Sequence, residues 1–196
     1  MALSIEPAAT RAVLSGHIAA VRDALARIPV ESIERVVDII MQAHERARHI
    51  YIVGNGGSAS TATHFACDLG KATIIDGRAR LRVTSLTDNI ALVTAWANDA
   101  SYERVFAEQL MNVLNAGDVV IAVSASGNSP NVLAAVDVAR VLDAVTVGLV
   151  GFSGGRLQRS VDAAVHVAAD DYGVVEDCHL VLEHAITDSV RSRLRA

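Results

Sequence analysis

The chain has 196 residues, a formal net charge of −5, an apolar fraction of 52% and an aromatic fraction of only 4%. This length suits one ordinary domain, and so many apolar residues are ample for a buried core. The negative charge argues against a protein that binds nucleic acid through a basic field. Two cysteines, Cys67 and Cys178, make no disulfide framework, and there is neither an apolar run of about 18 residues nor a secretory signal pattern. We expect a cytoplasmic protein that binds neither membrane nor nucleic acid.

Residues 1–48 are predicted to form a two-helix arm. Apolar residues recur at helical spacing from Val13 to Ile28, and Pro29 ends the run. The pattern restarts over residues 30–47, with Ser32 as the predicted N-cap. The arm is longer than one face of a sheet requires. It could pack against another subunit or serve only its own chain, and the pattern leaves both open.

From residue 49 onward, short apolar runs alternate with helical segments. The runs lie at 49–54, 81–86, 119–124, 144–151 and 163–169, and helices are predicted to begin near residues 58, 88, 101, 129 and 155. A last helix is predicted over residues 175–194. This alternation predicts an α/β fold with a doubly wound, five-stranded parallel sheet flanked by helices. We therefore expect an arm over 1–48 and a sheet region over 49–196, within a single structural domain.

Two of the predicted strands are followed by loops that suit a phosphate group. Ligands of open parallel sheets bind beyond the carboxyl ends of the strands. The first loop, "GNGGS" at 54–58, combines flexible glycines with a hydroxyl at a helix start, and the second, "SASGNS" at 124–129, brings three hydroxyls to one strand end. Hydroxyls, loop N–H groups and helix dipoles could hold a phosphate monoester without arginine. The alternatives are a purely structural glycine turn and an ordinary N-cap.

Two His/carboxylate pairs also stand out. His64 and Asp68 are four residues apart, so they lie on one side of a predicted helix. Glu176 and His184 are eight apart, a little over two turns, and lie on roughly one face of the last helix. Two histidines and two carboxylates could form a metal site or a general acid/base pair.

Spacing alone does not decide between such a site and ordinary surface contacts of a helix. The segment "EDCHLVLEH", residues 176–184, also contains the rival pair His179 and Glu183. Periodicity does not say which face of this helix looks inward.

The two loops in this order, together with "HFACDL" and "EDCHLVLEH", resemble the sugar isomerase (SIS) family, and within it the phosphoheptose isomerases. The resemblance implies an aldose–ketose isomerase that converts sedoheptulose 7-phosphate to D-glycero-D-manno-heptose 7-phosphate through an enediol. It further implies zinc, no redox or nucleotide cofactor, and a homotetramer assembled through the N-terminal helices. The alternatives are a non-catalytic adaptor like the replication-initiator-associated members and an isomerase of another phosphosugar.

The resemblance also implies roles for individual residues. As metal ligands it implies His64, Asp68, Glu176 and His184, with Asp68 and His184 moving the proton. The implied substrate-binding residues are Asn55, Gly56, Gly57, Ser58, Asn98, Asp99, Ser124, Ala125, Ser126, Ser129 and Glu176.

Four positions depart from the pattern of that family. Asp68 stands where the family has glutamate, Glu176 where it has glutamine, and Ala72 and Gly173 where it has arginine and aspartate. One methylene less shifts a base by roughly 1 Å, and misplacement on that scale can cost ~100-fold in rate. The added charge at Glu176 should strengthen metal binding and could raise the pKa of a neighbouring carboxylate. These departures bear on the substrate more than on the fold.

Overall fold

The computed structural model describes residues 7–196, and residues 1–6 of the predicted arm lie outside the described residues. Five parallel strands form one sheet in the order β2-β1-β3-β4-β5. They are β1 (His49–Val53), β2 (Arg82–Ser85), β3 (Val119–Ser124), β4 (Val145–Val150) and β5 (Ala163–His166). The predicted fold class and its five strands are confirmed.

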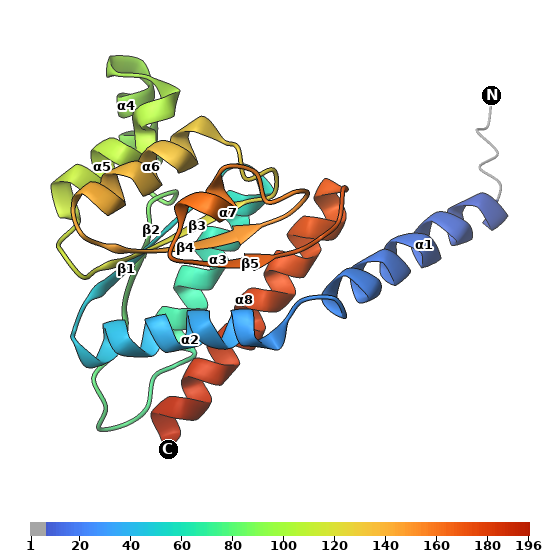
Figure 1. Cartoon of the computed structure of the whole chain (residues 1–196), viewed down its shortest axis with the longest axis horizontal. Coiled ribbons are helices and arrows are strands. Elements are labelled where there is room, and N and C mark those ends of the chain that lie inside the picture. The colour runs from blue at the N-terminus through green and yellow to red at the C-terminus, as the bar shows by residue number, and fades with distance from the viewer. Residues whose placement is uncertain (1–6) are drawn as a thin grey trace.

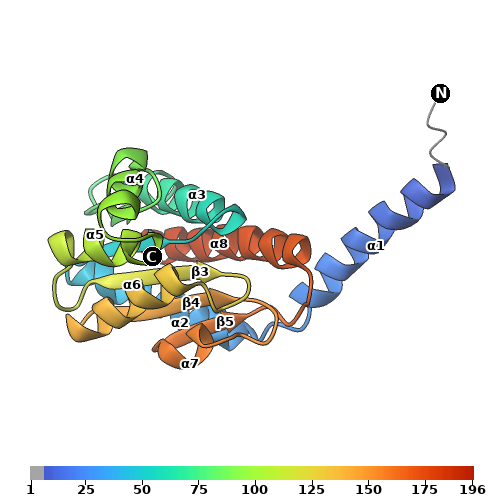
Figure 2. The same ribbon diagram turned by 90° about the horizontal axis from the view of Figure 1, so that it is seen from above.

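Helices cover both faces of this sheet. They are α1 (Pro7–Leu25), α2 (Val30–Glu45), α3 (Gly57–Lys71), α4 (Ile90–Asp99), α5 (Val105–Val113), α6 (Pro130–Val141), α7 (Leu157–Ser160) and α8 (Tyr172–Arg195), with a 3₁₀ turn η1 (Tyr102–Arg104). Helices α2, α3 and α8 pack on one face, and α5, α6 and α7 lie on the other (Figures 1 and 2). Among residues 7–196, no helix is both long enough and apolar enough to cross a bilayer.

The two cores follow from the alternation of side chains along the strands. In β1, Ile50 and Ile52 join the core under α2, α3 and α8, whereas Tyr51 and Val53 join the core under α5 and α6. Because both faces are covered, the central strands are apolar at nearly every position, as in β3.

The strand order places the two predicted phosphate loops next to each other. β1 pairs directly with β3, with Val53 opposite Ala122 near their carboxyl ends. The chain leaves β1 toward β2 on one side and continues from β3 toward β4 on the other. The loops after β1 and β3 therefore meet at the point where the sheet order reverses, which is where open α/β sheets bind ligands.

The start of α8 and the N-cap residue of α2 differ from the sequence predictions. Helix α8 begins three residues earlier than predicted, since the side chain of Asp171 accepts a hydrogen bond of 3.0 Å from the Val174 N–H. The prediction of Ser32 as the N-cap of α2 is wrong: the cap is Pro29, and the Ser32 hydroxyl donates back to the Pro29 carbonyl at 2.6 Å.

Helix α1 projects away from the body of the molecule (Figures 1 and 2). Its C-terminal half rests on the start of α8, where Ala24 is buried and His17 Nε2 lies 2.7 Å from Asp177 Oδ2. The outward-facing side of α1 leaves large apolar side chains in solvent. These are Val13, Leu14 and Ile18, which are 72%, 60% and 69% exposed.

Candidate active site and metal centre

A cavity of about 150 Å³ lies at the carboxyl ends of β1 and β3. It is lined by Asn55, Ser58, Val123, Ser124, Ala125, Ser126, Ser129, Tyr172 and Glu176. The loop after β1, the loop after β3 and the first turns of α8 all contribute to it. Most of the predicted substrate-binding residues therefore line one small polar cavity.

An amide pair joins the two loops. Asn55 and Asn131 exchange two hydrogen bonds, at 2.7 and 2.9 Å, and the Tyr102 hydroxyl donates to Asn55 Oδ1 at 2.9 Å. Gly56, at φ +56°, lets the chain turn sharply from this pair into α3. Sequence reasoning missed Asn131 and Tyr102, because no local pattern shows that they meet Asn55 across the loops.

The serine loop presents its hydroxyls toward the same cavity. Ser124 Oγ and Ser129 Oγ lie 3.2 Å apart, and Ser129 occupies the N-cap position of α6 without capping it through its side chain. Ser126 Oγ accepts the Asn128 N–H at 3.2 Å. These hydroxyls and the N-terminus of α6 make a cavity suited to an anion that accepts hydrogen bonds.

Glu176 lies in this cavity, against the first turn of α3. A Cβ atom at position 57 would collide with the Glu176 carboxylate, so Gly57 makes room for that side chain. Two predicted substrate-binding residues, Asn98 and Asp99, lie elsewhere. They are exposed at the end of α4, where a 2.7 Å hydrogen bond joins their side chains, and they do not line the cavity.

Four ionisable side chains meet where α3 packs on α8. His64 and Asp68 come from α3, Glu183 and His184 from α8, and one ligand atom from each lies within 4.8 Å of the other three. The His64 and His184 rings are edge to face, with centroids 4.9 Å apart. His184 Nε2 lies 3.6 Å from Asp68 Oδ2. Three of the four predicted metal ligands are thus brought together, with Glu183 beside them and Glu176 in the cavity.

Glu183 is the buried member of this group. Its side chain is fully buried, and neither carboxylate oxygen has a hydrogen-bond partner among residues 7–196. Burial, and then the nearby charge of Asp68, raise the pKa of Glu183 to about 8. Its Oε1 atom lies 3.3 Å from His64 Nδ1 and 3.4 Å from His184 Nε2, and a buried carboxylate is costly unless a cation or a proton accompanies it.

The donor set fits a divalent metal ion. Two imidazoles and two carboxylates offer the nitrogen and oxygen ligands that zinc binds. His64, Asp68 and His184 are 43%, 25% and 48% exposed, so the group is closed by Glu183 on the inner side and open on the outer side. An open side is what a metal that acts on a substrate needs.

Comparisons with known proteins agree with this architecture. A family model described as the SIS domain matches residues 16–151. The chain is 36% identical to a phosphoheptose isomerase of Mycobacterium tuberculosis over 170 residues, which cover 87% of this chain and 86% of that protein. It is 38% identical to a phosphoheptose isomerase of Helicobacter pylori over 160 residues, 82% of this chain and 83% of that one.

A solved structure of phosphoheptose isomerase from Neisseria gonorrhoeae superposes with a TM-score of 0.85 at 30% identity, covering 93% of this chain and 97% of the other. The chain therefore belongs to the SIS domain family. Its similarity to phosphoheptose isomerases over most of its length confirms the subgroup that the loop and helix motifs predicted.

Proposed function

We propose that this protein converts sedoheptulose 7-phosphate to D-glycero-D-manno-heptose 7-phosphate. Similarity to phosphoheptose isomerases along most of the chain supports an aldose–ketose isomerase. The observation that carries the proposal is that α3 and α8, whose first turns help to line the cavity with the serine loop, carry a His/carboxylate group further along. A phosphosugar needs one feature for its phosphate and the other for its carbonyl end.

The phosphate is held by hydroxyls rather than by cationic side chains. Ser58, Ser124, Ser126 and Ser129 line the cavity, and no lysine or arginine among residues 7–196 does so. Each hydroxyl can donate one hydrogen bond to a phosphate oxygen, and the N-termini of α3 and α6 add favourable partial charge. This arrangement suits a monoester that must be released after each turnover.

We propose zinc as the metal, held by His64, Asp68 and His184 with one further carboxylate. When bound, the ion supplies charge stabilisation to the developing oxyanion at C2 of the sugar. Asp68 removes a proton from C1, which gives the enediol as O2 gains a proton. His184 exchanges protons with the sugar oxygens, and return of a proton to C2 with loss of one from O1 gives the aldose. General acid/base help of this kind contributes roughly 10²–10⁴-fold.

The test is turnover of sedoheptulose 7-phosphate by zinc-loaded protein. We expect kcat to fall at least ~100-fold in Asp68→Asn and in His184→Ala, because each removes a proton-transferring group. Asp188→Asn is the matched control, since Asp188 is an exposed carboxylate on α8 that pairs with Arg191. Zinc-bound protein that turns over only another phosphosugar would replace the substrate. Protein with neither turnover nor zinc would point to a non-catalytic adaptor.

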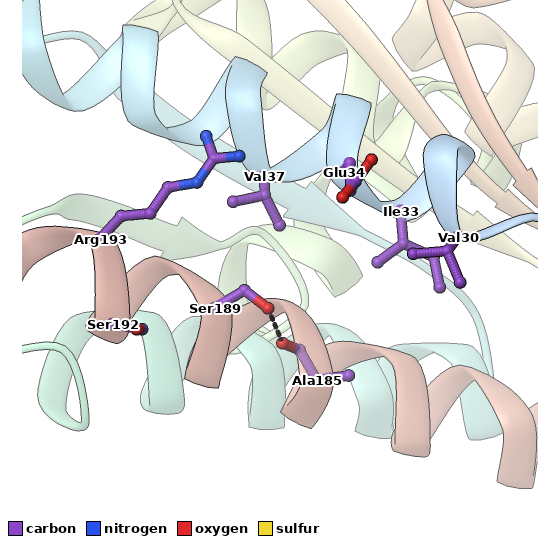
Figure 3. Close-up of a pocket in the computed structure, with 8 residues that line it drawn as sticks. All are labelled: Val30, Ile33, Glu34, Val37, Ala185, Ser189, Ser192 and Arg193. Carbon is purple, nitrogen blue, oxygen red and sulfur yellow. Dashed lines mark hydrogen bonds between the residues drawn. The ribbon is translucent and has the colours of Figure 1, made fainter.

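We also propose that the chain works as a homo-oligomer, with a tetramer as the expected assembly. Two uncovered apolar surfaces support this proposal. One is the exposed surface of α1 that carries Val13, Leu14 and Ile18. The other is a groove of about 450 Å³ between α2 and α8 (Figure 3). The groove is lined by Val30, Ile33, Glu34, Val37, Ala185, Ser189, Ser192 and Arg193. A second copy of the chain would cover both surfaces.

A further inference from the structure

We infer that Tyr172 determines specificity for the sugar part of the substrate. Its ring, backed by Phe152, forms a wall that contacts the carbon chain of a phosphosugar whose phosphate lies in the serine-lined cavity. This inference rests on the proposed phosphosugar substrate and deepens it, because it adds a group that distinguishes a phosphate ester from inorganic phosphate. Neither Tyr172 nor Phe152 is among the substrate-binding residues predicted from the sequence.

The serine-lined cavity is too small to enclose a whole sugar phosphate. Its volume is about 150 Å³. Pockets that enclose a complete small molecule typically measure about 300–1,000 Å³. A phosphate group that occupies the cavity therefore leaves the attached carbon chain at the rim. Tyr172, which has the largest side chain among the lining residues, stands at this rim on α8, four residues before Glu176 and on the same face of the helix.

Tyr172 is fixed at the start of α8 and yet leaves much of its surface uncovered. The side chain of Asp171 caps the helix by accepting a hydrogen bond of 3.0 Å from the Val174 N–H, so Tyr172 is the first helical residue. Although Tyr172 lines the cavity, it is 59% exposed. A ligand at the rim can therefore cover the ring, which offers a large apolar surface to C–H groups.

Phe152 supports the Tyr172 ring from the loop after β4. The two ring centroids are 4.8 Å apart, with the ring planes inclined by 56°. The Phe152 N–H donates to the Ala169 carbonyl at 3.0 Å, and the Phe152 carbonyl oxygen lies 2.7 Å from His166 Nε2. Phe152 also packs on the hydrophobic core, so it ties the Tyr172 ring to the body of the protein.

The backbone of Phe152 indicates that its side chain is needed. Phe152 has a φ of +46°, a left-handed conformation that is unfavourable for a residue with a Cβ atom. Gly154 and Gly155 in the same loop adopt positive φ values of +79° and +57°, which glycine takes without this cost. Such strained residues persist where the surrounding structure holds them, and they cluster at ligand sites. We therefore assign Phe152 as the positioning residue of the Tyr172 ring.

The experiment is isothermal titration calorimetry of the full-length protein with sedoheptulose 7-phosphate, fructose 6-phosphate and inorganic phosphate. We expect Tyr172→Ala to weaken each sugar phosphate that wild type binds by at least ~10-fold and inorganic phosphate by less than about 2-fold, because only an ester has a carbon chain against the ring. Tyr172→Phe keeps the ring and should stay within about 3-fold of wild type. Phe152→Gly should weaken the sugar phosphates by about 3-fold or more and spare inorganic phosphate.

Met111→Ala is the matched control. Met111 is 60% exposed, as Tyr172 is, and it lies on α5, on the other face of the sheet from α8. This variant should bind all three ligands as wild type does. Circular dichroism of each variant checks its fold.

Equal affinities of Tyr172→Ala and wild type for the sugar phosphates would overturn the inference and leave the proposed isomerase untouched. Parallel losses of sugar phosphates and inorganic phosphate would also overturn it, since they would show a damaged cavity. A Tyr172→Phe variant as weak as Tyr172→Ala would refute the role of the ring. Tyr172-dependent binding of fructose 6-phosphate without binding of sedoheptulose 7-phosphate would sink the proposed substrate and leave this inference standing. A wild type that binds no sugar phosphate would overturn both.

Discussion

Three polar side chains lie buried in a row on α8, at positions four residues apart. His179, Glu183 and Thr187 are each at most 2% exposed, and their polar side-chain atoms have no hydrogen-bond partner in residues 7–196. Glu183 has the imidazoles of His64 and His184 beside it, at 3.3 and 3.4 Å from its Oε1 atom. His179 instead stays neutral, because burial lowers its pKa to about 4. The backbone of Val150 has a smaller, opposite effect on this pKa, but it is not within hydrogen-bonding geometry of the His179 ring.

His179 should make the folded chain sensitive to acid. The unfolded histidine has a pKa of 6.5 and the folded one about 4, so the unfolded state binds the proton more readily between these values. The free energy of unfolding should therefore not depend on this histidine above pH 6.5. It should decrease as the pH drops toward 4, by about 3 kcal/mol in total. His179→Leu lacks this loss. Urea unfolding of metal-free wild type and variant from pH 4 to 8 measures it, and a pH-independent difference between the two would contradict it.

Three of the four residues of the His/carboxylate group could be predicted from the sequence. The i, i+4 spacing put His64 and Asp68 on one side of α3, where they are found beside His184. The presence of Glu183 in this group could not be predicted the same way, because periodicity does not say which face of α8 looks toward α3. Only the tertiary packing of α3 on α8 brings Glu183 next to His64.

At the scale of elements, hydrophobic periodicity was enough to place every strand. It could not place the start of α8, because the side chain of Asp171 caps this helix and apolar spacing does not show such a cap. Nor could it show how the serine loop is fixed. Gly127, at φ +64°, packs on the backbone of Gly154, and its carbonyl accepts the Leu157 N–H at 2.9 Å.

Gly127→Ala should therefore destabilise the protein by about 2–3 kcal/mol, since a Cβ there meets both an unfavourable φ and the Gly154 carbonyl. The displaced serine loop should also raise KM for the phosphosugar. Gly70→Ala is the control, because Gly70 lies within α3 with open space around its missing Cβ. It should change stability by less than about 1 kcal/mol and in the favourable direction. Equal effects of the two substitutions in urea unfolding would contradict the packing argument.

At the scale of the whole molecule, α1 is the element whose place the single chain does not explain. It is exposed along most of its length, and its apolar residues face solvent. The sequence left open whether the arm serves another subunit, and the exposed face now favours that role. Exposing these apolar side chains to water is unfavourable unless a partner covers them.

If the proposed tetramer forms through this arm, Ile18→Glu should shift it toward smaller species, because a charge would be buried in the contact between copies. Arg11→Glu also places a glutamate on the exposed surface of α1, but removes no apolar side chain, and should leave the mass unchanged. Light scattering after size exclusion gives the mass of each species. A monomeric wild type, or an Ile18→Glu variant with unaltered mass, would refute the role of the arm.

In the proposed mechanism, Asp68 and His184 move protons between C1 and C2 of a sugar phosphate. The measurement that tests it most directly is turnover of sedoheptulose 7-phosphate by zinc-loaded protein in D₂O, with NMR detection of the product. Proton transfer through side chains predicts a heptose 7-phosphate that carries deuterium at C2, formed at least ~100-fold more slowly by Asp68→Asn. Product without any solvent deuterium at C2, or undiminished turnover in that variant, would contradict the account.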